Sequence, residues 1–315
     1  MLRNAGTATT ILSRPTPQNP RAHVTAVLAL LAGAIAIATA PLFVKVSETG
    51  PVSTAFWRVF LAVPFLWAWA RADRSGGAAP TQRAQERRLL SLAGLLFAGD
   101  LAVWHWSIVL TTVATATLLA NLAPIFVTLA VWLWWRHRPG LIFISGLVIA
   151  ISGVTLLVGG DFRISGEALL GDLLGVITAM FYAAYQLAVT RLRGTTPTSR
   201  VMAWSGMVAA VCLLPIALVS GEQFLPATAA GWVKLFGLAL IAQVAGQSLI
   251  AHAMADLPPT FSSVGLLLQP VMAALFAWLL LGERLGTFQV AGGILVLIGI
   301  RIAHQANRRP ALSVP

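Results

Sequence analysis

The chain has 315 residues, of which 58% are hydrophobic and 10% are charged, and its formal net charge at pH 7 is +11. About 25% of the residues of a typical soluble domain are charged, so this composition excludes an ordinary water-soluble protein. The basic residues lie between apolar segments instead of forming one patch, which argues against a nucleic-acid partner. The single cysteine, Cys212, excludes a disulfide framework and a cysteine-based metal cluster.

Residues 1–23 are predicted to form a disordered cytoplasmic tail, because they contain three arginines and three prolines but no apolar run. The first apolar segment, 24–46, follows directly. Ala38-Thr39-Ala40 within it resembles a signal-peptidase site, but the apolar run around it is too long for a signal peptide. We therefore expect an uncleaved membrane span.

Nine further apolar segments follow, and each is close to the ~20 residues that cross the hydrocarbon core as a helix. The ten predicted spans are 24–46, 52–70, 89–108, 112–135, 140–158, 171–190, 201–219, 231–251, 260–281 and 287–305. The longest connection, 71–88, contains glycines and several arginines and is predicted to be a flexible cytoplasmic loop. Residues 306–315 are predicted to form a second cytoplasmic tail.

The sequence repeats itself when it is displaced by 146 positions, so that Arg88 falls on Lys234 and Pro124 on Pro270. The two copies, 24–158 and 171–305, are separated by a loop at 159–170, and each contains five spans. Because five is odd, the second copy enters the membrane upside down relative to the first. Secondary transporters build two alternately opening halves in this way. The predicted fold class is an all-α integral membrane protein whose ten transmembrane helices form two inverted-topology five-helix repeats.

Arginine and lysine predict the direction of the spans. With the N-terminus inside, 16 of the 21 basic residues fall in cytoplasmic segments, four fall on the opposite side, and Arg58 lies within a span. Because cytoplasmic loops carry an excess of Lys and Arg, this distribution places both termini in the cytoplasm. We expect an integral protein of the cell (inner) membrane.

Three ionisable side chains lie clearly inside the predicted spans: Arg58, Asp100 and His105. Arg58 and Asp100 lie ~9 Å and ~12 Å from the outer ends of spans 2 and 3 at a rise of 1.5 Å per residue. Asn121 lies at a comparable depth in span 4. Intramembrane charges usually mark a functional pathway or a structural pair. Either Arg58 binds a substrate anion while Asp100 titrates, or the two residues form a static ion pair.

His105 follows Trp104 near the outer mouth of span 3. A histidine at this depth can gate a pathway or sense protons. An interfacial side chain with a satisfied hydrogen bond is the more common outcome, and we favour it.

The second repeat offers uncharged polar groups where the first has charges, because Arg58 falls on Trp204 and Asp100 on Gly246. The polar candidates are Tyr182, Tyr185, Gln186, Gln243, Gln247 and Gln269. Such groups in an apolar wall suit a zwitterionic or aromatic small molecule. The same groups also hold helices together through interhelical hydrogen bonds, and for any single residue that reading is favoured.

Prolines and glycines predict the shape of the bundle. Three prolines lie inside spans 1, 4 and 9, where they free backbone carbonyls and bend the helices: Pro41, Pro124 and Pro270. Spans 5 and 10 carry small residues that favour close helix packing, including Gly146, Gly153, Gly292 and Gly299. We interpret these two spans as structural, or as a dimer surface.

Two segments resemble a known family. The first copy has Ala114-Thr115-Ala116-Thr117-Leu118-Leu119 and Leu122-Ala123-Pro124-Ile125-Phe126, and the second has Leu268-Gln269-Pro270-Val271 and Leu281-Gly282-Glu283-Arg284. These resemble the EamA branch of the drug/metabolite transporter superfamily, and Phe56-Trp57-Arg58 also fits that branch. The resemblance covers 24–305. It departs from the family at Arg136-His137-Arg138, which replaces the glycine–glutamate pair in the first copy.

This resemblance implies a ten-helix bundle with spans 5 and 10 at the periphery and a central cavity among the other eight. It also implies export of small metabolites, among which amino acids are common. We therefore expect a secondary transporter that exports amino acids or similar amphipathic compounds by alternating access, with Asp100 as the proton-linked group if transport is coupled. The alternative is a flippase, or an exporter of lipid-like, polyamine or drug-like cations, although a polyamine carrier should show several cavity carboxylates.

An enzyme is not expected. Membrane-embedded enzymes need paired aspartates for a metal-bound diphosphate or a histidine–glutamate metal motif, and the sequence contains neither. It likewise predicts no metal and no cofactor. The expected partners are a small-molecule substrate, membrane lipids and, in the coupled case, protons, with the chain acting as a monomer or a homodimer.

Overall fold

The computed structural model describes residues 20–73, 80–111, 113–136, 138–158, 166–282 and 285–308. Most of both predicted tails and of the predicted loop 159–170 lies outside these ranges. The helices are α2 (Pro20–Ile37), α3 (Ala40–Lys45), α4 (Pro51–Ala72), α5 (Pro80–Leu110), α6 (Val113–Ala120), α7 (Ala123–Trp135), α8 (Leu141–Val158), α9 (Gly166–Arg193), α10 (Thr198–Val219), α11 (Ala229–Leu238), the π-helix η1 (Ala239–Gln247), α12 (Ser248–Ala253), α13 (Pro259–Gly265), α14 (Leu268–Leu281) and α15 (Thr287–Arg308).

The predicted fold class is confirmed: the described part of the chain contains ten helical stretches long and apolar enough to cross a membrane. The largest difference from the predicted boundaries is in the third span, which begins at Ala84 within the longer helix α5. Its first turns carry Arg87 and Arg88. Hydropathy marks only the apolar part of a helix, so it missed these polar turns.

Three spans are interrupted close to their prolines. α2 ends at Ile37 and α3 begins at Ala40, one residue before Pro41. The same pattern separates α6 from α7 ahead of Pro124, and α13 from α14 ahead of Pro270. A proline has no N–H to donate to the carbonyl four residues earlier, and its ring crowds that carbonyl, so the helix ends there.

The eighth span changes its helix type in the middle. Its central nine residues, η1, are π-helical and contain both Gln243 and Gln247. π-Helical turns are rare and occur often at functional sites. Residue spacing alone gave no signal for this change.

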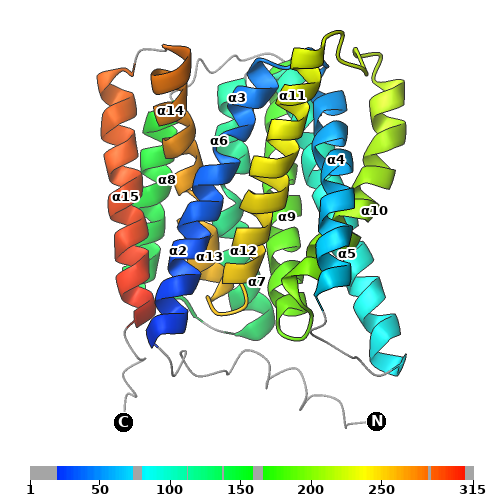
Figure 1. The fold of residues 1–315 in the computed structure, drawn as a ribbon. Coiled ribbons are helices and arrows are strands. Elements are labelled where there is room, and N and C mark those ends of the chain that lie inside the picture. The colour runs from blue at the N-terminus through cyan, green and yellow to red at the C-terminus, as the bar shows by residue number, and fades with distance from the viewer. Residues whose placement is uncertain are drawn as a thin grey trace, which may run out of the picture.

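The helices pair in the way that inverted repeats require (Figure 1). α5 packs on α9, and its repeat-related image is the packing of η1 and α12 on α2. α4 packs on its counterpart α10, α13 contacts α7, and α8 packs on α15. Figure 1 shows the start of α2 and the end of α15 at the same end of the bundle, which we call the terminal end. The other end is called the distal end.

α8 and α15 approach each other through glycines at one side of the bundle (Figure 1). A Cβ atom on Gly153 would lie 2.7 Å from the carbonyl oxygen of Gly292, and one on Gly146 would lie 2.8 Å from that of Gly299. No side chain fits at these positions. The glycine faces that we interpreted as structural or as a dimer surface are therefore occupied inside the chain.

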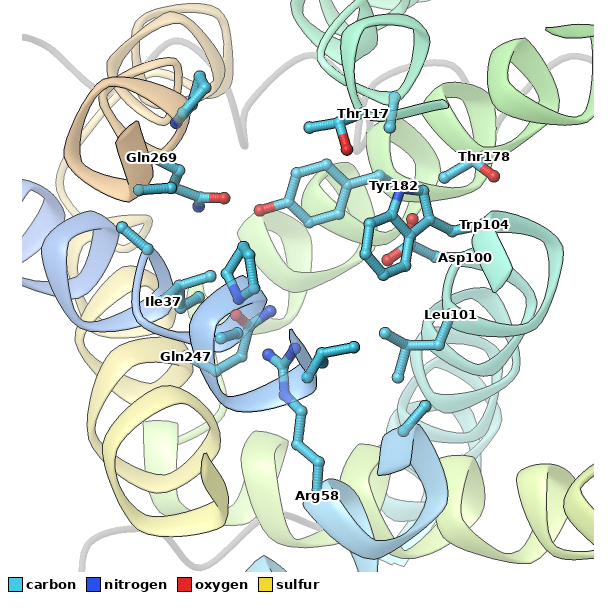
Figure 2. Close-up of a pocket in the computed structure, with 18 of the residues that line it drawn as sticks. Ile37, Arg58, Asp100, Leu101, Trp104, Thr117, Thr178, Tyr182, Gln247 and Gln269 are labelled. Atoms are coloured by element: carbon cyan, nitrogen blue, oxygen red, sulfur yellow. The ribbon is translucent and has the colours of Figure 1, made fainter. Parts of the chain in front are cut away.

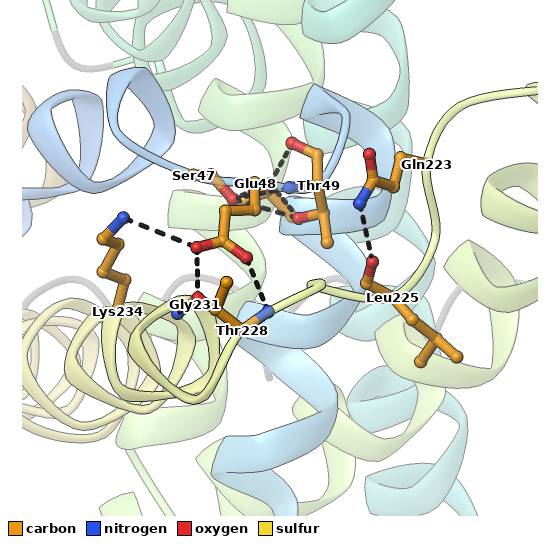
Figure 3. A network of polar contacts seen from close by, with 9 residues as sticks. Ser47, Glu48, Thr49, Gln223, Leu225, Thr228, Gly231 and Lys234 are labelled. Carbon is orange, nitrogen blue, oxygen red and sulfur yellow. Dashed lines mark hydrogen bonds and ion pairs between the residues drawn. The ribbon is translucent and has the colours of Figure 1, made fainter.

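Polar contacts hold the connecting segments at the distal end. Glu48 accepts hydrogen bonds from the backbone N–H of Thr228 at 3.0 Å and from its hydroxyl at 2.5 Å, and Lys234 lies 3.9 Å away (Figure 3). Glu222 accepts from the N–H groups of Val52 and Ser53, at 2.9 and 3.2 Å, at the start of α4. Carboxylates at the first turn of a helix satisfy free N–H groups and complement the helix dipole.

The terminal end is held by a comparable set of contacts. The hydroxyl of Ser199, which is the repeat-related counterpart of Ser53, donates to Asp73 at 2.6 Å. Glu86 accepts from Thr196 at 3.1 Å and from Arg200 at 3.3 Å. These contacts join α4 to α10 at the terminal end and to the segment after α10 at the distal end, and Glu86 joins α10 to α5.

Candidate functional site

A cavity of about 190 Å³ lies among seven of the ten spans. Both repeats line it, through α2, α3, α4, α5, α6, α9, α11, η1 and α14. α4 begins at the distal end, and its cavity residues Thr54, Ala55 and Arg58 lie in its first turns. The cavity therefore lies toward the distal end. Nearer the terminal end the core includes the fully buried apolar side chains of Leu66, Leu90, Leu192 and Phe261.

The seventh span, α10, contributes none of the lining residues. The resemblance had implied a cavity among eight spans. In the structure α10 packs against α4 and α5, which stand between it and the cavity.

Arg58 projects from α4 into the cavity, and Gln243 holds it there. The Nε atom of Arg58 donates to Oε1 of Gln243 across 3.1 Å. Gln243 is 2% exposed and does not itself line the cavity, so it acts as a support for the guanidinium. Gln243 lies in the middle of the π-helical segment η1.

Asp100 and Trp104 lie one turn apart on α5, on the side of the cavity across from Gln247 and Gln269 (Figure 2). α5 and α9 are in close contact here, because a Cβ atom on Gly99 would lie 2.7 Å from the ring of Phe181. Among the residues that the structure describes, Arg58 and Asp100 form no ion pair within 4.0 Å. Of the two arrangements that the sequence allowed, the structure does not show the static pair.

Three further polar side chains complete the lining. Tyr182 points into the cavity toward Gln269, from the side opposite Arg58 (Figure 2). Asn121 lies in the break between α6 and α7 and donates to the carbonyl of Thr117 at 2.8 Å. Gln269 follows the break between α13 and α14, and its Nε2 atom is buried without a hydrogen-bond partner. The helix breaks thus place amide groups at the cavity wall.

The remaining predicted residues lie outside this cavity or only support it. Tyr185 accepts a hydrogen bond from Nε2 of Gln247 at 3.2 Å, and together with Gln186 it borders a second, narrower void. Pro41 and Pro270 line the main cavity, whereas Pro124 is buried away from it. The side chain of His105 lies outside the described residues.

Sequence reasoning missed the threonines of the lining. Thr54, Thr117 and Thr178 all border the cavity, and the hydroxyl of Thr178 is buried without a partner. Threonines are common in membrane helices, where their hydroxyls bond to carbonyls of their own helix. Only the packing of the helices shows which of them face a void. Among the described residues no group of His, Cys, Asp and Glu could hold a metal ion.

The sequence profile of the EamA-like transporter family matches residues 24–159 and 169–303, which together make up most of the chain. The chain belongs to this family. As an EamA-like transporter it is an integral membrane protein of the drug/metabolite transporter superfamily.

Relatives of this EamA-like chain are named as transporters. An uncharacterized transporter of Archaeoglobus fulgidus is 26% identical over 269 residues, covering 82% of this chain and 90% of the relative. A probable terminal-alkyne amino-acid exporter of Streptantibioticus cattleyicolor is 27% identical, covering 74% and 79%. A solved crystal structure superposes with a TM-score of 0.76 at 17% identity, covering 91% of this chain and 98% of that one, which shows a shared fold.

Proposed function

We propose that this EamA-like transporter exports amino acids or similar small zwitterionic metabolites across the cell (inner) membrane by alternating access. The observation that carries this proposal is that Arg58 and Asp100 line the same cavity without forming an ion pair. A guanidinium binds a carboxylate, and a carboxylate binds an ammonium group. Two opposite charges that face one void from different helices match the two ends of an amino acid.

The size and wall of the cavity support a compact ligand. Sites for drug-sized molecules enclose ~300–1,000 Å³, whereas this cavity encloses about 190 Å³. Phe97, Trp104 and Tyr182 supply aromatic surface beside the charges. For a polyamine or a drug-like cation, the cavity supplies only one carboxylate, and the positive guanidinium of Arg58 would repel the bound cation. The exporter from Streptantibioticus, whose name specifies an amino acid, supports the same class.

The proposed direction follows from the charges between the spans. If the 16 basic residues of one side lie in the cytoplasm, the terminal end is cytoplasmic and the cavity lies toward the exterior. The breaks beside Pro41, Asn121 and Gln269 all border the cavity, where short non-helical turns can absorb the change in angle between the two repeats. Both repeats supply lining residues, so a rocking motion of one repeat against the other would change the shape of the cavity.

Counterflow in proteoliposomes tests the proposal. Vesicles holding the purified protein and unlabelled amino acids would be diluted into radiolabelled L-phenylalanine or L-threonine, and uptake followed. Phenethylamine and phenylpropionate, which each lack one charged end of phenylalanine, would be added as competitors. We expect uptake of at least one amino acid. We also expect each analogue to compete less strongly than unlabelled L-phenylalanine. Competition by the amine alone, or no amino-acid exchange, would contradict the proposal and favour cations or lipids.

A further inference from the structure

A face of α9 connects the main cavity with the narrower void nearer the terminal end. Thr178, Tyr182 and Gln186 are spaced by four residues and therefore lie on one face of the helix. Thr178 and Tyr182 line the main cavity, and Tyr182 and Gln186 border the second void. Gln186 lies ~12 Å further along α9 than Thr178, at a rise of 1.5 Å per residue. Gln247 borders both spaces, so it separates them together with Tyr182.

Gln186 is buried in this void with an unused acceptor. Its side chain is 1% exposed, and its Oε1 atom has no hydrogen-bond partner. Gln247, which could donate, instead bonds to the hydroxyl of Tyr185 at 3.2 Å. The void is bordered on its other sides by the apolar Val189, Ile250 and Met254, and it is too narrow to admit a water molecule.

An unpaired amide oxygen in a dry, apolar setting destabilises the state in which it occurs. A leucine of similar size would fill the same space without that penalty. A glutamine at this position is therefore explained if its Oε1 atom gains a hydrogen-bond partner in another conformation of the transporter, in which the void is open.

We propose that Gln186 forms a second substrate station, which accepts a hydrogen bond from an ammonium or other N–H donor as the substrate passes Tyr182 and Gln247. This inference rests on the proposed function and specifies a path within it. Arg58 and Asp100 bind the substrate in the distal half, and Gln186 receives its nitrogen in the half toward the terminal end. An uncharged acceptor binds an ammonium group without trapping it, which suits an intermediate position.

The test uses Gln186→Leu in the full-length protein, reconstituted and assayed with the labelled amino acid that the wild type exchanges, L-phenylalanine or L-threonine. Thr190→Val is the matched control, because Thr190 is one turn further along α9 and its hydroxyl bonds within the helix to the carbonyl of Gln186 at 2.9 Å. Melting temperature, the maximal exchange rate and KM for substrate added on the distal side would be measured for each variant.

We expect Gln186→Leu to keep or raise the melting temperature and to leave KM unchanged, while the maximal exchange rate falls about tenfold, as for the loss of one hydrogen bond to a charged group. Thr190→Val should exchange at the wild-type rate. Wild-type exchange by Gln186→Leu would overturn the second station and leave the proposed function intact. A lower melting temperature in step with the lower rate would also overturn it, because Gln186 would then be a structural residue. Failure of the wild type to exchange either amino acid would instead contradict the proposed function.

Discussion

A single methyl group at the contact between α8 and α15 should separate the two helices. In Gly292→Ala the new Cβ atom would lie 2.4 Å from the backbone nitrogen of Leu157 and 2.6 Å from the carbonyl oxygen of Gly153. Both neighbours are backbone atoms, so no side-chain rotation relieves the clash. Overpacking of a close-packed interior costs about 1–3 kcal/mol, and the backbone setting places this site in the upper half of that range.

Gly293→Ala is the matched control, because it lies on the same helix and its nearest neighbours are side-chain atoms at 3.4 and 3.6 Å. Both variants gain about 1 kcal/mol of helix propensity, which cancels in the comparison. With an unfolding entropy of about 2.1 cal/mol/K per residue, a chain of 315 residues changes its melting temperature by about 1.5 °C per kcal/mol, so Gly292→Ala should melt about 3–5 °C below Gly293→Ala in detergent micelles. Equal melting temperatures would refute the reasoning that these glycines fix the helix separation.

Three further predictions concern the distal contacts and the cavity. Trp57→Phe should cost about 0.5–1.5 kcal/mol of unfolding free energy, because it removes the Nε1 bond to the carbonyl of Phe224 at 2.7 Å; an unchanged melting temperature would contradict this. Asp100→Asn should raise KM for amino-acid exchange about tenfold, because it removes the carboxylate that we propose binds the ammonium group of the substrate, and an unchanged KM would remove Asp100 from substrate binding. The hydrogen bond from Thr228 holds the pKa of Glu48 below its usual range. Ionised Glu48 therefore stabilises the fold at pH values above that usual range, and this stabilisation is lost as the pH falls through the lowered pKa of the folded state. The melting temperature of the wild type should therefore fall between about pH 5 and pH 3, and that of Glu48→Gln should change less. The same pH dependence of the melting temperature in both proteins would contradict a stabilising role for the Glu48–Thr228 hydrogen bond.

The fold was predictable from the sequence because hydropathy, the repeat and the count of basic residues are properties of whole segments. The charged members of the site, Arg58 and Asp100, were also predictable, since a charge inside an apolar span stands out. Their separation was not, because Arg58 bonds to Gln243, which lies in a π-helical segment of the eighth span that residue spacing does not reveal. Thr178 carried no signal at all, because its hydroxyl matters only through the void beside it.

Protection of an engineered cysteine by substrate tests most directly whether this cavity is the transport site. Thr117→Cys would be made in a Cys212→Ala background and labelled from the distal side with a membrane-impermeant maleimide. Thr287→Cys, which is exposed at the distal end of α15 and does not line the cavity, is the control. We predict that the amino acid exchanged by the wild type slows labelling at Thr117→Cys, over the same concentration range that saturates exchange, and leaves labelling at Thr287→Cys unchanged. Labelling of Thr117→Cys at the same rate with and without saturating substrate would contradict the account.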